Sequence, residues 1–199
     1  MVETDHTAAI DAYFKRSSEA LSRAAADSSV RAAVNRITAV IVLCFRAGGK
    51  LMLAGNGGSA ADAQHIAAEF LSRYTMDRKP LPAIALTADT SVLTAVGNDY
   101  GFERVFERQV RGLGRKGDVF VAISTSGQSP NILAALKAAR ELGIVTVGFT
   151  GSRTSPMTAL CDHALIAPSE ETPIIQQIHL VAAHTICGLV EQELFGNSL

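Results

Sequence analysis

The sequence contains three clusters of polar residues whose types and spacing suit chemistry on an oxygen-rich ligand. The first is the string GNGGSA at residues 55–60, which follows a short apolar run and opens a helical segment. Its glycines permit positive φ and let backbone N–H groups approach a ligand closely. The string also fits the GxGxxA pattern of dinucleotide sites, but the acidic residue expected about 20 positions later is missing. We favour a site for sugar hydroxyls or phosphate over a nucleotide site or a tight turn without a ligand.

The second cluster is the string STSGQS at residues 124–129, which offers four hydroxyls directly after another apolar run. Ser129 is predicted to be the N-cap of a helix that has Pro130 at its first position. Free N–H groups, the positive end of the helix dipole and the hydroxyls together favour binding of a phosphate monoester. The loop contains no lysine, which excludes a P-loop. The alternative interpretation is a serine-rich capped turn without a ligand.

The third cluster combines two helical segments that are far apart in the sequence. His65 and Glu69 are four residues apart and therefore share one helix face, about two turns beyond the glycine-rich string. Gln176 and His184 are separated by eight residues, roughly 12 Å along a helix and about 80° around it. They lie in a long uncharged segment, where an unpartnered polar side chain is costly. These residue types suit a metal site or an acid–base pair, although isolated HxxxE pairs also occur on solvated helices.

The elements that must position these clusters alternate between apolar runs and helical segments. Five continuously apolar runs predict strands that are buried on both faces of a parallel sheet, at residues 51–54, 82–86, 119–123, 144–149 and 163–167. Helices are predicted at residues 7–26, 30–47, 59–74, 131–142, 156–160 and 172–190, with a shorter pair across 91–111. The alternation predicts an α/β fold, a three-layer αβα sandwich around a five-stranded parallel sheet. Ligands of such sheets bind at the C-terminal strand ends.

Composition limits the class of protein. The 199 residues are 48% hydrophobic and 19% charged, which predicts a folded chain and one domain, 1–199, without an internal boundary. A net charge of −1 provides no basic excess for a phosphate backbone, so we expect no nucleic-acid partner. The three cysteines form no CxxC pair, and the charged N-terminus lacks the apolar run of a signal peptide, so we expect a cytoplasmic protein.

Some polar residues are predicted to be structural. The uncharged segment 172–190 is nearly long enough to span a membrane, but its proline, glutamines and histidines favour a helix buried in protein. His179 and Gln177 share this helix but not the face of Gln176 and His184. The string GNDYG at residues 97–101 is interpreted from its pattern as a polar turn that stops a helix.

Taken together, the strings resemble the bacterial phosphoheptose isomerase family, which has the sugar isomerase (SIS) fold. The resemblance covers nearly the whole chain and rests on AGGK at 47–50, GNGGS at 55–59, DAQH at 62–65, GND at 97–99, STSG at 124–127, and IQ at 175–176 with His179 and His184. It implies an aldose–ketose isomerase that converts D-sedoheptulose 7-phosphate to D-glycero-D-manno-heptose 7-phosphate, for lipopolysaccharide core or related surface glycans. It also implies a homotetramer with active sites between subunits, and a helical extension, residues 1–47, used in oligomer packing.

The resemblance also implies roles for individual residues. Glu69 and His184 match the acid–base pair of the family. One zinc ion per active site is implied, with the ligands His65, Glu69, Gln176 and His184. Substrate contacts are implied for Asn56, Gly57, Gly58, Glu69, Asn98, Asp99 and Gln176, and phosphate contacts for Ser124, Thr125, Ser126 and Ser129. These roles replace the interpretation of residues 97–101 as a mere helix stop. The chain departs from the family at Gln177, where many members carry Glu.

A non-catalytic protein with the same fold is the alternative function. One form would be a binding module similar to the SIS-fold protein that associates with the bacterial replication initiator, and another a regulator that senses sugar phosphates. Both Glu69 and His184 are present, which favours an enzyme, because the related binding protein lacks that pair. No appended DNA-binding domain fits into 199 residues.

Overall fold

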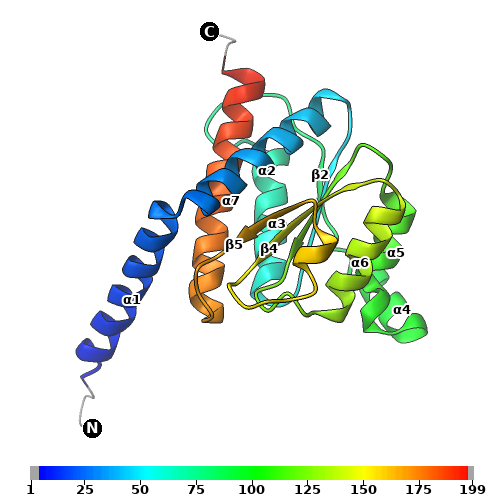
Figure 1. Cartoon of the computed structure of the whole chain (residues 1–199). Coiled ribbons are helices and arrows are strands. Elements are labelled where there is room, and N and C mark those ends of the chain that lie inside the picture. The colour runs from blue at the N-terminus through cyan, green and yellow to red at the C-terminus, as the bar shows by residue number, and fades with distance from the viewer. Residues whose placement is uncertain (1–4, 197–199) are drawn as a thin grey trace.

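Five short apolar segments form one parallel sheet, which confirms the predicted fold class (Figure 1). The structure is a computed structural model that describes residues 5–196. The strands are β1 (Leu51–Gly55), β2 (Ala83–Ala85), β3 (Val119–Ile123), β4 (Val145–Thr150) and β5 (His163–Ile166). Their order in the sheet is β2-β1-β3-β4-β5, and every neighbouring pair is parallel. The order reverses at β1, so the switch point of the sheet, where ligands of such folds bind, lies between β1 and β3.

The central strands are buried on both faces, as their continuous apolar runs predict. Every residue of β1 and β3 is buried. The edge strand β2 starts one residue later than predicted, because Pro82 accepts a hydrogen bond from the Leu51 N–H (2.9 Å) but has no N–H to donate in return. The ladder of β2 therefore starts only at Ala83.

Helices cover both faces of the sheet and complete the predicted three layers. One face is covered by α2 (Ser28–Arg46), α3 (Gly58–Leu71) and α7 (Thr172–Phe195). The opposite face is covered by α4 (Thr90–Tyr100), α5 (Val105–Leu113) and α6 (Pro130–Glu141). Two 3-10 turns, Phe102–Arg104 and Thr158–Leu160, connect elements at the margins. The elements that carry the three polar clusters, α3, α6 and α7, thus flank the same sheet.

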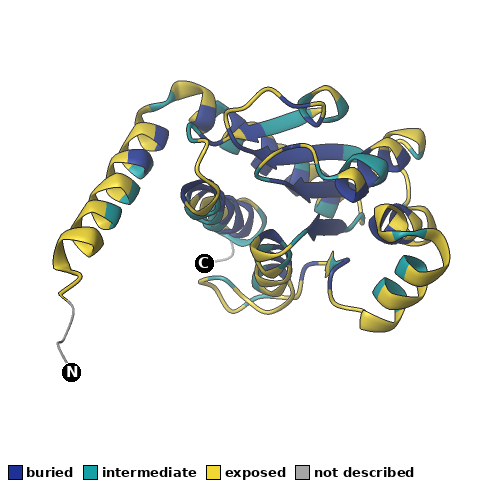
Figure 2. Cartoon of the chain, turned by 90° about the horizontal axis from the view of Figure 1, so that it is seen from below, coloured by how far each residue is buried: buried dark blue, intermediate teal, exposed yellow. Residues whose placement is uncertain are grey.

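The first helix, α1 (Thr7–Ala26), extends away from the sheet and is mostly exposed (Figures 1 and 2). It packs against α7 through Ala20 and Ala24, whose side chains join a small cluster with Ile174 and Ile178. At the same junction the Gln177 amide donates a hydrogen bond to the Tyr13 hydroxyl (3.1 Å). Gln177 therefore has the structural role that its position on α7 predicts.

Three helix ends differ from the prediction. The helix α2 begins at Ser28, since the Asp27 carboxylate accepts a hydrogen bond from the Ser29 N–H (2.7 Å) and caps it. Residues 97–99 lie in the last turn of α4, not in a turn between helices, and α4 ends at Tyr100, before the C-cap residue Gly101, which has a φ of +87°. The helix α7 runs five residues further than predicted, past the buried Glu191.

The helices α2 and α7 are long and apolar enough to cross a membrane if length and composition alone are considered. Buried residues make up 44% of the apolar window in α2 and 50% of that in α7. Both helices belong to the core that packs on one face of the sheet. Core helices pass the same test, so α7 fits the predicted helix buried in protein and does not indicate a membrane span.

His179 is a buried histidine in the middle of α7. It is 1% exposed, and its Nε2 lies 3.1 Å from the Thr150 carbonyl at the end of β4. Its Nδ1 has no hydrogen-bond partner within residues 5–196. Burial lowers the pKa of His179 to about 4, because the charged imidazolium loses its hydration.

We expect the titration of His179 to make the protein less stable in acid. The unfolded chain takes up this proton near pH 6.5 and the folded chain only near pH 4, so stability is complete above pH 6.5 and falls between these values. The expected loss in the free energy of unfolding between pH 7 and pH 4 is about 3 kcal/mol. His179→Gln keeps a donor for Thr150 but does not titrate, so this part of the pH dependence should disappear in urea unfolding curves. An equal slope with pH in both proteins would contradict the assignment.

Candidate active site

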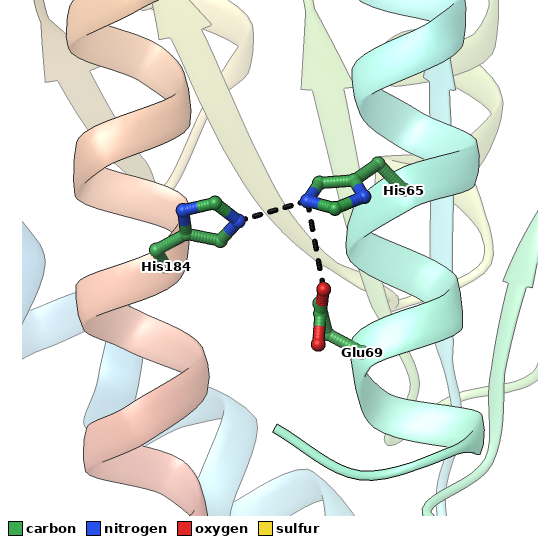
Figure 3. A group of neighbouring side chains, drawn as sticks. All are labelled: His65, Glu69 and His184. Carbon is green, nitrogen blue, oxygen red and sulfur yellow. Dashed lines mark hydrogen bonds and ion pairs between the residues drawn. The ribbon is translucent and has the colours of Figure 1, made fainter. Parts of the chain in front are cut away.

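Three polar side chains from two neighbouring helices meet on one side of the sheet (Figure 3). His65 Nε2 lies 2.8 Å from His184 Nε2 and 3.5 Å from Glu69 Oε1. The two imidazole rings are nearly perpendicular, with centroids 5.1 Å apart and an interplanar angle of 72°. One candidate donor atom from each of the three residues lies within 4.8 Å of the others. We call this group the His65–Glu69–His184 triad.

The sequence brings these residues together through the parallel course of α3 and α7. His65 and Glu69 are one turn apart and face α7, and His184 projects from α7 toward them (Figure 3). Both helices start at the C-terminal edge of the sheet. An added Cβ at Gly58 would lie 2.5 Å from the Gln176 Nε2, so the glycine leaves room for this amide.

Gln176 is the fourth predicted metal ligand. Its amide lies against Gly58, whereas His184 on the same helix faces His65. Seven residues separate Gly58 from His65 and eight separate Gln176 from His184, so the two contacts are about two helical turns apart. The structure thus brings three of the four predicted ligands together, and ligation by Gln176 stays a prediction.

The surroundings of the triad are partly open to solvent. The side chain of His65 is 47% exposed and that of Glu69 is 21% exposed. One turn before His65, Asp62 has a buried carboxylate oxygen without a hydrogen-bond partner among residues 5–196, and burial raises its pKa. The triad therefore lies where a small molecule can reach it, beside a carboxyl group whose ionisation is disfavoured.

The predicted phosphate loop follows β3 and leads into α6. Ser129 is the N-cap and Pro130 the first helical residue, as predicted, but the Ser129 hydroxyl does not cap the helix. It lies 3.0 Å from the Ser124 hydroxyl instead. Gly127 has a φ of +63°, and an added Cβ would overlap the Ser155 hydroxyl. A glycine is therefore required for the turn that gathers these hydroxyls at the start of α6.

The glycine-rich string lies beside the phosphate loop, across the switch point of the sheet. Asn56 and Asn131 exchange two hydrogen bonds, of 2.9 and 2.8 Å, between their side-chain amides. Gly57 has a φ of +56° at the start of α3, a conformation that suits glycine. Asn131 is 3% exposed and joins the two loops into one unit. Asn131 is not among the predicted site residues, although it directly follows Pro130, the predicted first residue of α6.

Asn98 and Asp99 lie apart from the other predicted site residues. Both are exposed in the last turn of α4, on the opposite face of the sheet from α3 and α7. Asn98 donates a hydrogen bond to the Asp99 carboxylate (2.7 Å). Within one chain they are thus not part of the triad or of the two loops, and a substrate contact for them stays a prediction.

The triad has the donor set of a zinc site. Two imidazole nitrogens and a carboxylate oxygen are ligands that zinc takes in catalytic sites, which keep a further position open. A hydrogen bond between His65 Nε2 and His184 Nε2 requires one ring to accept, so at least one nitrogen presents a lone pair toward the other. The three residues therefore fit a zinc ion in chemical type and proximity.

The chain is similar to known proteins in sequence and in structure. The family model described as "SIS domain" matches residues 12–151. A phosphoheptose isomerase of Bradyrhizobium sp. is 58% identical over 185 residues, which cover 93% of each chain. The solved phosphoheptose isomerase from Neisseria gonorrhoeae has a TM-score of 0.89 at 39% identity and covers 94% of this chain and 100% of its own. The one from Francisella tularensis has a TM-score of 0.90 at 35% identity, with coverages of 95% and 100%. The similarity extends over nearly the whole chain.

Proposed function

The chain belongs to the phosphoheptose isomerase family of SIS-domain proteins, and we infer that it is an aldose–ketose isomerase that converts D-sedoheptulose 7-phosphate to D-glycero-D-manno-heptose 7-phosphate. The observation that carries this function is the placement of Glu69 and His184 on facing helices, about two turns beyond the loops at the switch point. The substrate also has two separate ends that need different contacts, because its reacting carbons are C1 and C2 and its phosphate is on C7. Two separate groups of residues are thus needed, one for each end.

Isomerisation needs groups that move two protons. One proton passes between C1 and C2 through an enediolate, and another passes between the two oxygens. Glu69 is the proposed base for the carbon-bound proton, since a carboxylate of modest basicity suits this task. His184 is the proposed acid, because its imidazole can donate a proton to a substrate oxygen. We propose that Ser124, Thr125, Ser126 and Ser129 hold the phosphate, and that Asn56, Gly57, Gly58 and Gln176 hold the sugar.

We further propose one zinc ion per active site, with His65, Glu69, Gln176 and His184 as its ligands. Glu69 and His184 would bind the metal and transfer protons at different stages of turnover. The proximity of three of these side chains and their donor types support the proposal. When bound, zinc would supply positive charge that stabilises the enediolate as a Lewis acid does. A mixed shell of His, Glu and Gln is weaker than a cysteine-rich structural site and suits an exchangeable ion.

Removal of zinc is expected to reduce turnover. Protein purified without chelator should contain about one zinc ion per chain by elemental analysis, and dialysis against a chelator should lower kcat on sedoheptulose 7-phosphate by at least about 10-fold. Activity should return on addition of Zn²⁺ but not of Mg²⁺, which prefers oxygen ligands. Full activity of zinc-free protein would count against the metal while leaving the isomerase function intact.

A homotetramer with active sites between subunits is our proposal for the assembly, with residues 1–47 as the helical extension that packs it. Large apolar side chains such as Phe14, Leu43 and Val181 are 71%, 62% and 52% exposed in the single chain. A cavity of about 480 Å³ with a mainly apolar lining lies between α1, α2 and α7. Such surfaces are typical of regions that another subunit covers. An interface would also explain how the α4 residues Asn98 and Asp99 reach a substrate.

Light scattering should give a mass four times the 21.0 kDa of one chain at micromolar concentration. A monomer would contradict the assembly.

We also propose that the whole chain, 1–199, acts as one domain and that the protein works in the cytoplasm. Its product would supply heptose for lipopolysaccharide core or related surface glycans.

A further inference from the structure

Glu191 is a buried carboxylate near the end of α7 that gathers the segment following α3. It is 1% exposed. It accepts hydrogen bonds from three successive backbone N–H groups, those of Tyr74 (3.0 Å), Thr75 (2.7 Å) and Met76 (2.7 Å). The Thr75 hydroxyl donates a further bond of 2.8 Å. The carboxylate therefore fixes the course of the chain where it leaves α3.

Arg78 links Glu191 to the C-terminal end of α3. Its side chain is 3% exposed, and its Nε donates to Glu191 Oε2 at 2.9 Å. Its Nη2 donates to the Glu69 carbonyl (2.9 Å) and its Nη1 to the Phe70 carbonyl (2.7 Å). The last carbonyls of a helix have no partner within the helix, so the guanidinium takes that place at the end of α3. One of these carbonyls belongs to Glu69, a residue of the triad.

The ion pair of Arg78 and Glu191 thus connects α3 and α7, the two helices that carry the triad. His184 and Glu191 are seven residues apart, nearly two full turns, and share one face of α7. Tyr74 spans the distance between them: its ring is 5.8 Å from that of His184 and tilted by 33°. Gly188 lies under this ring, since an added Cβ would be 3.2 Å from the Tyr74 Cε1. The chain after α3 is therefore packed against α7 from Glu191 back to His184.

We propose that Arg78 and Glu191 are positioning residues, which hold the last turn of α3 against α7 at the spacing that the His65–Glu69–His184 triad needs. The inference rests on the proposed isomerase function and adds to it the device that keeps Glu69 and His184 in register. A triad built from two helices depends on their relative placement, and small displacements of reacting groups are costly for catalysis.

The charges of Arg78 and Glu191 support a role in positioning α3 relative to α7. Burial by itself raises the pKa of Glu191, but the hydrogen bonds from Thr75 and from the backbone N–H groups of 74–76 outweigh it and lower the pKa to about 2. The carboxylate is therefore ionised at any working pH. Buried ion pairs add little net stability compared with apolar packing, and fixing one arrangement of chain segments is their best-attested use.

The test compares Glu191→Gln and Arg78→Lys with a matched control, Asp118→Asn. Asp118 is also a buried carboxylate, 3% exposed, and it accepts bonds from the Lys50 ammonium and from the N–H groups of Lys50 and Arg115. It precedes β3, at the opposite edge of the sheet from the loops and the start of α3.

All variants should lose thermal stability. Only the Glu191 and Arg78 variants should also bind Zn²⁺ about 10–100-fold more weakly in chelator competition and lose kcat by a similar factor. KM for sedoheptulose 7-phosphate should change little, because the phosphate loop is untouched.

Thr75→Ala keeps the proposal testable if either of these variants does not fold. Thr75 is exposed, and its substitution removes one of the five bonds to Glu191. We expect a loss of about 2–5-fold in kcat and in zinc affinity at nearly unchanged KM. Wild-type kcat and zinc affinity in the folded variants, or equal losses in Asp118→Asn, would overturn the positioning role and leave the proposed function standing. A wild-type protein that neither isomerises sedoheptulose 7-phosphate nor binds zinc would overturn the proposed function and this inference together.

Discussion

Glu69→Gln is expected to lower kcat on sedoheptulose 7-phosphate by about 10²–10⁴-fold, the usual contribution of a positioned base. The substitution keeps the size of the side chain and one oxygen, but it removes the basic carboxylate. Glu69 is 21% exposed and lies 3.5 Å from His65 Nε2, where an amide can still hydrogen-bond. Folding and assembly should therefore persist, and in protein with the wild-type zinc content the loss reports on proton transfer.

Solvent-deuterium exchange at the transferred carbon measures the proton step directly. Wild-type protein should exchange this hydrogen during turnover, and Glu69→Gln should do so more slowly by the same factor as its loss in kcat. Glu141→Gln provides a control for the chemical change, because Glu141 is an exposed partner of Arg111 on the opposite face of the sheet. If Glu69→Gln exchanges and turns over as fast as wild type, the base is another residue.

His184→Ala should also remove most activity, but it is a less clean experiment. The side chain packs against both His65 and Tyr74, so its truncation leaves a hole between α3 and α7. The double variant of Glu69 and His184 should lose far less than the product of the single losses. Residues that act as one unit show this non-additivity, because each becomes ineffective without the other.

The fold and the three polar clusters could be predicted from local patterns in the sequence. Continuous apolar runs predict strands buried on both faces, and all five strands are found at these runs. His65 and Glu69 share a helix face at a spacing of four, which any α-helix provides. That His184 faces this pair follows from the resemblance and not from the pattern, since residues 119 positions apart meet only through the packing of α3 on α7.

The supporting contacts of the site could not be predicted in the same way. Arg78 and Glu191 are two charged residues among many, and their pairing depends on where the chain after α3 crosses α7. Asn131 and Asn56 are 75 positions apart and meet only because β1 and β3 are neighbours in the sheet. Local periodicity carries no information about such contacts, whereas the strand order and the parallel course of two helices determine them.

Loss of the substrate phosphate is expected to have the second-largest effect. Unphosphorylated sedoheptulose should be turned over with a kcat/KM about 10³-fold lower than sedoheptulose 7-phosphate. Hydrogen bonds to a charged group contribute roughly 1.5–3 kcal/mol each, and two or more are available from the Ser124–Ser129 loop and the start of α6. Steady-state kinetics with both sugars measures the ratio. Equal rates on the two sugars would contradict a phosphate role for this loop.

Gly127→Ala tests whether this preference comes from the loop. A Cβ there must occupy a left-handed conformation and overlaps the Ser155 hydroxyl, so the loop has to deform. The variant should lose most of the preference for the phosphorylated sugar, while the triad, which lies on α3 and α7, is unchanged. Gly143→Ala is the matched control, because its φ of +70° imposes the same kind of strain but its Cβ would meet nothing closer than 3.5 Å. It should lose about 1 kcal/mol of stability and keep the preference. If Gly127→Ala and Gly143→Ala both keep the preference for the phosphorylated sugar, the phosphate is bound by other residues.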